Sequence, residues 1–541
     1  MARKNNLVKN ASILMIAIIV ARVIGLLYRR PLGQILGTVG LGYYGYASNL
    51  YTILLLISSF SIPTALSKII SEKMAKGEYR NSQKIFKGAL LYAVIIGGIF
   101  ALIAFFGGRI LLPGNQANAI PALKVLAPTI FLSAVLGVLR GYFQAHKNMT
   151  PTSVSQVIEQ IFNAIVSIAA ALILIKTLAP EGGTGRAVWG AVGGTMGTGA
   201  GVLFGLLFMW YVYGVNRKTI SRIVARDVNG TEDSYTDIFK LILIVVTPII
   251  ITSFINNAST YLDAYLYSAL QGRAGIDSDV ISAAYGEYSN YYIPLINIPL
   301  ALAAASVAAM MPEVSSSYAV QRMEDANNSV GTTIRLTMFV CLPSTVGLTV
   351  LSSPIMKILF PASTDLSAKL LLTGSLYVVF AALSTITSGV LQAIGRQKEA
   401  MINAGISLGI NLVFQTLVLL AVPKLDIYSV MISNILFSVV LCVVNDLSLK
   451  KHLGFRNELR LTYAMPLLAS AVMAAAAAGI YYGLHILTKQ VFLPLVIAIL
   501  AGVIVYLVMY AVFTRIPENQ LRTFPMGSKM VKILKFLHVY Q

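Results

Sequence analysis

Long apolar runs alternate with short polar connectors along almost the whole chain. A helix needs about 20 apolar residues to cross a hydrocarbon core about 30 Å thick, and most of these runs reach that length. We therefore expect an all-α integral membrane protein with fourteen membrane-spanning helices. The expected spans are 7–28, 44–70, 88–108, 121–141, 151–176, 187–214, 239–266, 284–311, 331–356, 366–391, 400–423, 427–447, 462–485 and 491–513.

Two short segments in the second and eighth expected spans resemble each other. Tyr44–Tyr51 has the sequence YGYASNLY, and Tyr285–Tyr292, 241 residues later, has the sequence YGEYSNYY. The similar order of spans around both segments predicts a duplicated bundle. Further matching positions, at an offset of 248 residues, are Gln144, Ala145 and Asn163 with Gln392, Ala393 and Asn411.

The repeat predicts two pseudo-symmetric six-helix lobes facing each other across a cavity. Duplicated lobes around a site at the bilayer midplane are a common plan for secondary transporters. The expected division is an N-terminal lobe with its linker at 1–238, a C-terminal lobe at 239–448, and two extra spans with a basic tail at 449–541.

Composition agrees with a membrane location. Of the 541 residues, 57% are hydrophobic and 11% are charged, whereas soluble domains carry about 25% charged residues. The net charge of +20 could suggest nucleic acid, but the basic residues lie in connectors between apolar runs, so we expect no nucleic-acid partner. About 29 Lys and Arg residues fall on the side of the termini and about 11 on the other, which by the positive-inside rule places both termini in the cytoplasm.

Soluble-enzyme chemistry has no signal in the sequence. The chain lacks a GxxxxGK(S/T) phosphate loop, and its four histidines are scattered singly, without metal-ligand spacing. Its two cysteines, Cys341 and Cys442, lie inside apolar runs. The glycine-rich segment Gly194–Gly205 lies in an expected span, so close helix packing explains it better than nucleotide binding. We expect no enzyme activity, no organic cofactor and no metal site.

The basic candidates for a functional site lie in and just after the first expected span. Arg22 is fifteen residues past Leu7, about 22 Å along a helix, which is too deep to reach back to the cytoplasm. Arg29 and Arg30 break the positive-inside pattern at the outer end. Three arginines lining a cavity would make a phosphate site, since guanidinium binds such oxyanions bidentately. The alternative is that Arg22 extends outward beside Arg29 and Arg30.

Acidic residues inside expected spans are further candidates, because burying charge in lipid is expensive. Asp263 of span seven could pair with a cavity arginine, bind a cation, or cap local polar groups. Glu159 of span five belongs to a polar stripe that faces either a cavity or a neighbouring helix. Glu287 of span eight is another candidate. Other members of the stripe are Ser155, Gln156, Gln160 and Asn163, and further polar candidates are Ser48, Asn49 and Asn290.

The residues also resemble a known family. Fourteen spans in a six-plus-six-plus-two arrangement are similar to the MOP exporter superfamily, which contains multidrug antiporters and flippases of lipid-linked oligosaccharides. Within it, three segments resemble the Gram-positive, YtgP- and SpoVB-like branch of MurJ-type lipid II flippases. These are ARVIGLLYR at Ala21–Arg29, FSIPTALSKIISE at Phe60–Glu72 and RGYFQAHKNMTPTSVSQVIEQI at Arg140–Ile161. The resemblance covers the whole chain, and the last segment is the most specific.

The resemblance implies roles for particular residues. Arg22 matches the essential first-helix arginine of the family's R-x-x-G segment. Arg29 lies one position away from the place where the family has a second cavity arginine. The charged residues that many Gram-negative members place in span two are absent here, which leaves the exact substrate open. Some members hold a sodium ion between spans seven and eleven, and the nearest equivalents here are Asp263, Asn411 and Gln415.

The expected function is therefore that of a flippase in the bacterial cell membrane. Rocking lobes would carry lipid II, an undecaprenyl-pyrophosphate-linked peptidoglycan precursor, from the inner to the outer leaflet, with Na⁺ or H⁺ as candidate coupling ion. Spans thirteen and fourteen would form a groove for the lipid tail. A monomer is expected, with the cell-wall synthesis machinery as a candidate partner. Alternatives are a flippase for a teichoic, capsular or sporulation-specific glycan, a cation-coupled multidrug antiporter, and a structural scaffold of the division machinery.

The tail after the last span also suggests a partner. Lys529, Lys532 and Lys535 recur every three residues between apolar positions. Such a segment can lie flat on anionic membrane lipids of the cytoplasmic leaflet, and a disordered basic tail is the alternative.

Overall fold

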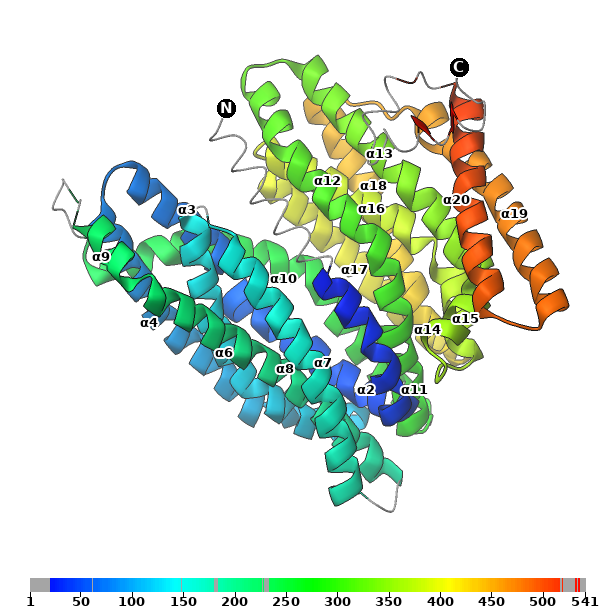
Figure 1. The fold of residues 1–541 in the computed structure, drawn as a ribbon, viewed down its shortest axis with the longest axis horizontal. Coiled ribbons are helices and arrows are strands. Elements are labelled where there is room, and N and C mark those ends of the chain that lie inside the picture. The colour runs from blue at the N-terminus through cyan, green and yellow to red at the C-terminus, as the bar shows by residue number, and fades with distance from the viewer. Residues whose placement is uncertain are drawn as a thin grey trace. The chain divides into compact units, whose positions relative to one another are not determined.

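The computed structural model describes residues 20–60, 62–146, 148–179, 183–225, 227, 233–515, 518, 531–532 and 534–535. Helices account for nearly all of these residues and no strand occurs among them, which confirms the expected all-α class (Figure 1). Most of the first expected span lies outside the described residues.

The chain divides into two compact units, Met1–Gly286 and Glu287–Gln541. In the N-terminal unit, residues 20–27 are helical and lead almost directly into α2. The remaining elements of this unit are α2 (Arg29–Leu55), η1 (Leu56–Phe60), α3 (Ile62–Ala75), α4 (Tyr79–Phe106), α5 (Gly108–Leu111), η2 (Gly114–Ala119), α6 (Ile120–Ala145), α7 (Thr150–Leu178), α8 (Gly183–Val215), α9 (Arg217–Val224), α10 (Tyr235–Arg273) and α11 (Ser278–Glu287).

The C-terminal unit begins at the last residue of α11 and is also helical. Its elements are η3 (Tyr288–Tyr292), α12 (Ile293–Ala319), α13 (Met323–Val350), α14 (Ser352–Leu359), α15 (Asp365–Gly374), α16 (Tyr377–Ala393), α17 (Gln397–Ala421), η4 (Pro423–Leu425), α18 (Tyr428–Leu453), η5 (Arg460–Ala464), α19 (Met465–Thr488) and α20 (Phe492–Thr514).

The expected spans correspond well to these helices. Each expected span from the third to the fourteenth overlaps a helix or a broken helix pair. Among the described residues, ten helices are long and apolar enough to cross a membrane, or eleven if α15 and α16, which meet at a bend of 50°, form one span. This range is compatible with fourteen spans, and that count stays a prediction. Some helices are longer than the expected spans, because their first turns carry polar residues that an apolar run leaves out. Glu324 and Asp325 in the first turn of α13 are an example.

The two compact units differ in their boundary from the lobes that the repeat predicts. Helix α10 begins the expected C-terminal lobe, yet it packs with α2, α3 and α4 of the N-terminal unit. The division into lobes after residue 238 is inferred from the sequence repeat, and it stays a prediction.

Both tyrosine-rich segments are associated with irregular helix. The π-helical turn η1 follows Tyr44–Tyr51 by a few residues, and η3 forms the end of Tyr285–Tyr292. Such turns interrupt the regular hydrogen-bond ladder and are frequent at functional sites. Helix α2 is also kinked at Gly37, whose φ of 67° and ψ of 175° require glycine.

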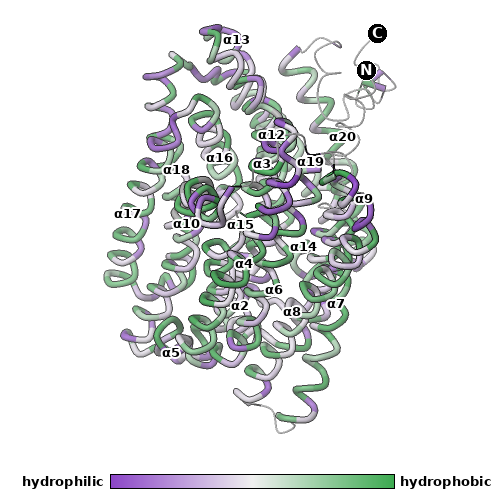
Figure 2. Tube along the Cα trace, turned by 90° about the vertical axis from the view of Figure 1, so that its left-hand side faces the viewer, coloured by the Kyte–Doolittle hydropathy of each residue, from purple (hydrophilic) through white to green (hydrophobic). Residues whose placement is uncertain are grey.

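Glycines bring α7 and α8 into backbone contact. A Cβ on Gly193 would lie 2.3 Å from the Cα atom of Ala171, and one on Gly201 would lie 2.4 Å from the carbonyl oxygen of Glu159. Helices in lipid pack closely through small residues in this way. The contacts confirm close packing as the reason for the glycine-rich segment of α8. In Figure 2 the hydrophilic residues of α9 contrast with the hydrophobic residues of α7, as expected for a connector outside the apolar spans.

The basic tail lies mostly outside the described residues. Of its described positions, Val531 and Leu534 are buried in a cluster with Met473 of α19 and Tyr510 of α20. These apolar positions therefore pack on the protein, and binding of the tail to anionic lipids stays a prediction.

Candidate functional site

The arginine group lies at the junction of the first helix and α2. Arg22 and Arg30 are exposed, and Arg29 is partly buried. Backbone hydrogen bonds from Tyr28 to Ile24 and from Leu32 to Tyr28 keep the helix almost continuous across the junction. Arg22 and Arg29 are seven residues apart, so they lie on the same side of this helix, about 10 Å apart along its axis.

Two contacts hold this segment in place. A Cβ on Gly25 would lie 3.6 Å from Oε1 of Gln160, so the first helix approaches the polar stripe of α7 at this glycine. The buried Tyr28 has its hydroxyl oxygen 3.5 Å from that of Tyr44 in α2. The candidate arginines are therefore carried by a helix that packs on two others within the N-terminal unit.

Glu159 forms an ion pair with an arginine that the sequence did not single out. Its Oε2 lies 2.7 Å from Nη2 of Arg140, whose Nε donates to Ser155 Oγ at 3.0 Å. The two charged side chains are 23% and 16% exposed. Inside an expected span, such a pair neutralises two charges that lipid would not accept alone. Arg140 lies near the predicted cytoplasmic end of expected span four. The positive-inside rule explains a basic residue there, so there was no reason to select it from the sequence.

Another polar side chain of α7, Ser167, makes hydrogen bonds inside the helix bundle. Ser167, two turns beyond Glu159, donates to the carbonyl oxygen of Gly194 at 2.7 Å and contacts Asn163 Oδ1 at 3.0 Å. The bond to Gly194 joins α7 to α8, as interhelical hydrogen bonds do in membranes, whereas the contact with Asn163 lies within α7. For Glu159 and its partner Arg140, both partly exposed, a position facing a cavity stays a prediction.

Asp263 is fully buried in α10. Close to it, Asn49 of α2 donates to the carbonyl oxygen of Thr260 at 2.9 Å and to the hydroxyl of Tyr285 at 3.0 Å. The ring of Tyr285 stacks on Tyr46 with centroids 4.3 Å apart. Asn49 thus links α2, α10 and α11 at one point, next to a buried carboxylate.

Helices α2 and α11 cross through glycine. A Cβ on Gly42 would lie 2.0 Å from the carbonyl oxygen of Ser282, and one on Gly286 would lie 2.4 Å from that of Thr38. A hydrogen bond also joins the two helices: the hydroxyl of Tyr43 in α2 donates to Asp279 Oδ1 in α11 at 2.6 Å. The two helices that carry the tyrosine-rich repeats are therefore in direct contact.

Glu287 has a structural position. Its carboxylate accepts hydrogen bonds from the hydroxyl and amide of Thr364, at 2.7 and 3.2 Å, and from those of Ser367, at 2.5 and 3.1 Å. These groups belong to the N-terminus of α15, where a negative charge is favoured by the helix dipole. We therefore place Glu287 at a helix cap and leave it out of the proposed substrate site.

The candidate cation residues fall in different units. Asn411 and Gln415 are fully buried one turn apart in α17, whereas Asp263 lies in the N-terminal unit. Within the described part of the chain, no group of three or more His, Cys, Asp or Glu side chains could hold a metal ion. The sodium assignment stays a prediction.

A buried amide network in the C-terminal unit was missed by the sequence analysis. Asn403 of α17 donates to Asn445 Oδ1 at 3.0 Å, and Asn445 of α18 donates to the hydroxyls of Thr387 and Ser388 in α16, at 3.1 and 2.9 Å. Fully satisfied polar networks fix how helices pack. Asparagine inside an apolar run was the available signal, but its partners lie on other helices.

Two connectors at one end of the N-terminal unit are clamped together. Lys73 Nζ lies 2.9 Å from Glu78 and 3.0 Å from Asp233, and Asn81 donates to both carboxylates. The hydrogen bond from Asn81 and the charge of Lys73 lower the pKa of both carboxyl groups. Burial opposes the charge on Lys73, but the two carboxylates outweigh it and raise its pKa. The contact places these two connectors at the same end of the unit, as the predicted topology requires.

An ion pair and a buried carboxylate inside the spans of a multi-pass helical protein are features typical of substrate or ion pathways. Solved structures with the same fold agree. A structure described as "Lipid II flippase MurJ, inward closed conformation" has a TM-score of 0.66 and 16% identity, covering 93% of this chain and 98% of that one. An inward-facing multidrug resistance MATE family transporter of the MOP superfamily has a TM-score of 0.64 and 17% identity, covering 80% and 94%.

Family models and relatives narrow the class. The model of the polysaccharide biosynthesis protein family matches residues 7–318, and the MatE model matches 248–417. The chain belongs to the polysaccharide biosynthesis protein family and is a MOP superfamily flippase of the MurJ/SpoVB type. This confirms the resemblance seen in the sequence, the membrane location and the absence of an enzymatic role in the family.

Two curated relatives come from Bacillus subtilis (strain 168). "Lipid II flippase MurJ" is 25% identical over 497 residues, which cover 87% of this chain and 88% of the relative. "Stage V sporulation protein B" is 22% identical over 537 residues, covering 98% and 99%.

Proposed function

We propose that the chain moves lipid II from the inner to the outer leaflet by alternating access, with Arg22, Arg29 and Arg30 binding the pyrophosphate. The observation that carries this is the position of Arg22 and Arg29 on one side of a nearly continuous helix. Two guanidinium groups in this arrangement suit a ligand with two linked phosphates, each bound bidentately. The similarity to a lipid II flippase supports the choice of substrate.

The acidic residues have separate proposed roles. The Arg140–Glu159 pair forms part of the cavity wall, where its partial exposure leaves it in reach of a polar head group. Asp263, fully buried in α10, binds the coupling ion, Na⁺ or H⁺. Arginine rather than acidic and aromatic residues at the first helix argues against a drug antiporter.

Complementation of a strain depleted of its own lipid II flippase tests the proposal. Arg22→Ala should abolish growth at normal protein levels, and Arg22→Lys should rescue only partly, because an ammonium lacks the bidentate fork. Arg217→Ala, at an exposed arginine of α9, is the matched control and should complement fully. Growth with Arg22→Ala would remove the pyrophosphate assignment.

A second candidate is a flippase for another undecaprenyl-linked glycan. It is favoured by the stage V sporulation protein B relative, which matches nearly the whole chain. In that case the chain would fail in the depleted strain but would restore sporulation in a strain lacking the relative, with the same dependence on Arg22. Drug resistance without either rescue would instead indicate an antiporter.

A further inference from the structure

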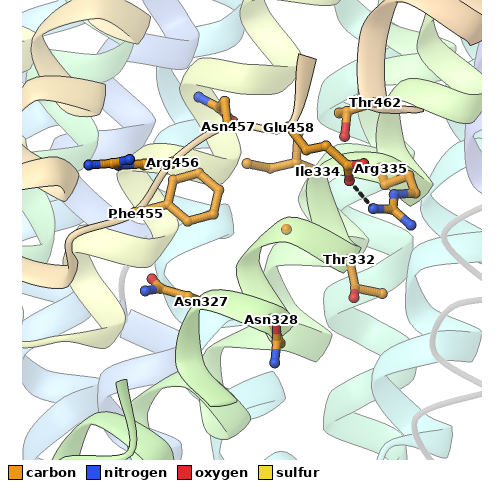
Figure 3. Close-up of a pocket in the computed structure, with 11 residues that line it drawn as sticks. Asn327, Asn328, Thr332, Ile334, Arg335, Phe455, Arg456, Asn457, Glu458 and Thr462 are labelled. Carbon is orange, nitrogen blue, oxygen red and sulfur yellow. Dashed lines mark hydrogen bonds and ion pairs between the residues drawn. The ribbon is translucent and has the colours of Figure 1, made fainter. Parts of the chain in front are cut away.

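A cavity of about 230 Å³ lies in the C-terminal unit and shares no lining residue with the sites described above. One wall is the first half of α13, and the other is the segment that joins α18 to α19, residues 454–462 (Figure 3). The left-handed Gly454, with φ of 61°, ends α18 and turns the chain across α13. Since a water molecule occupies about 30 Å³, the cavity has room for a small head group.

The lining combines charge, hydrogen-bonding groups and one aromatic ring. Figure 3 shows Arg335 paired with Glu458 on one side, Phe455 and Arg456 on the opposite side, and Asn327 and Asn328 below them. Two arginines, Arg335 and Arg456, and one glutamate, Glu458, give the lining a net charge of +1. The cavity therefore suits a ligand with a single negative charge.

Two buried polar atoms of the lining have unused hydrogen-bonding capacity. Nε of Arg335 and Oδ1 of Asn327 find no partner among the residues that the structure describes. Asn327 Nδ2 donates to the carbonyl oxygen of Leu453 at 2.9 Å, which holds the amide in place. Leaving such groups unsatisfied costs about 1–3 kcal/mol each, so a ligand that supplies both an acceptor and a hydroxyl donor would stabilise the site.

The depth of the cavity indicates where the ligand comes from. Gly331 is eight residues, or about 12 Å, inside the start of α13, whose first residues Glu324 and Asp325 are exposed. Leu459, beside Glu458, is 70% exposed. An exposed leucine next to exposed charged residues is typical of the interface between water and lipid. The predicted topology makes this the cytoplasmic leaflet, where basic pockets between helices bind anionic head groups.

We infer that this cavity binds the phosphodiester head group of an anionic phospholipid that carries free hydroxyls. Arg335 binds the phosphate, Arg456 adds a second positive charge to the lining, and Asn327 Oδ1 accepts from a head-group hydroxyl. The site is separate from the proposed pyrophosphate site and does not depend on the transported substrate.

The test uses the full-length protein in detergent, with native mass spectrometry to count bound phosphatidylglycerol and phosphatidylcholine. Phosphatidylglycerol should be retained at least tenfold more strongly. Two variants should lose this preference: Gly331→Leu, which places a side chain toward the Phe455 ring 4.0 Å away, and the pair Arg335→Gln with Arg456→Gln, which changes the net charge of the lining from +1 to −1. Arg322→Gln, at an exposed arginine before α13, is the matched control and should keep it.

Soluble sn-glycerol 3-phosphate separates the two sources of this chemistry. If it displaces the lipid in the wild type at similar concentration, the site takes a free phosphate ester with the same groups; if it does not, the lipid is the ligand. Equal retention of both lipids by the wild type, or undiminished preference in both variants with unchanged melting temperature, would overturn the inference.

Discussion

Tyr46 of α2 and Tyr285 of α11 stack face to face, with ring centroids 4.3 Å apart and planes only 2° from parallel. Both residues belong to the tyrosine-rich repeat segments, and Asn49 adds a hydrogen bond to the Tyr285 hydroxyl at 3.0 Å. The sequence pairs Tyr285 with Tyr44 as equivalent positions in the repeat. In the structure Tyr44 instead approaches Tyr28, so the residue that meets Tyr285 is two positions further along.

This contact gives a cross-linking prediction. In a background without Cys341 and Cys442, Tyr46→Cys with Tyr285→Cys should be joined by a short bifunctional reagent, and substrate flipping should stop. Tyr44→Cys with Tyr285→Cys is the control and should react more slowly. Efficient joining of Tyr46 and Tyr285 positions with full flipping would show that α2 and α11 do not need to separate.

Glu287 gives a stability prediction. Glu287→Gln keeps the shape but removes the charge and turns one acceptor into a donor, which can face the Thr364 hydroxyl. We expect a loss of about 2–3 kcal/mol in unfolding free energy, as for buried hydrogen bonds to a charged group. Glu313→Gln, at an exposed glutamate in α12, should be neutral. Equal stability of Glu287→Gln, measured by thermal unfolding in detergent, would argue against the cap.

The Arg140–Glu159 pair predicts non-additive mutations. Arg140→Gln and Glu159→Gln alone each leave one charge without its partner, whereas the double variant leaves none. Since both groups are partly exposed, we expect a coupling energy of about 1–2 kcal/mol in a double-mutant cycle, below the value for fully buried pairs. The exposed pair Glu72–Lys76 serves as reference and should show no measurable coupling. Additive effects for Arg140 and Glu159 would mean that the pair contributes no energy.

The Lys73 clamp predicts a pH window. Glu78 and Asp233 have lowered pKa values, so their contribution is complete above the ordinary carboxyl pKa of about 4 and is lost as pH falls further. The raised pKa of Lys73 makes its contribution complete below about 10.4 and lost as pH rises beyond it. Protection of the first turns of α10 from hydrogen exchange should be constant between these limits.

A matched pair of variants separates the clamp from general effects of charge. At neutral pH, Lys73→Gln should accelerate exchange at the start of α10, whereas Lys76→Gln, in the same connector, should not. Similar acceleration in both variants would show that Lys73 has no specific role.

The sequence predicts the fold far better than the partners of its polar residues. Apolar runs of about 20 residues predict where helices lie, because a helix satisfies all its backbone hydrogen bonds within one segment in lipid. The period of the stripe around Glu159 also predicts a face turned away from lipid. The partner of Glu159 could not be predicted in the same way, because it depends on how two helices are rotated against each other. Glu287 and Ser367 are 80 residues apart, and no local pattern relates them.

The crossing of α2 and α11 at Gly42 and Gly286 has a consequence for motion. Side chains that interlock between helices must leave their rotamer wells before the helices can turn. At the glycines backbone meets backbone, so rotation of α11 on α2 is opposed mainly by the contacts beside the crossing, from Tyr43 to Asp279 and from Asn49 to Tyr285. The crossing can act as a pivot, and the stack of Tyr46 on Tyr285 beside it must separate before α11 turns far.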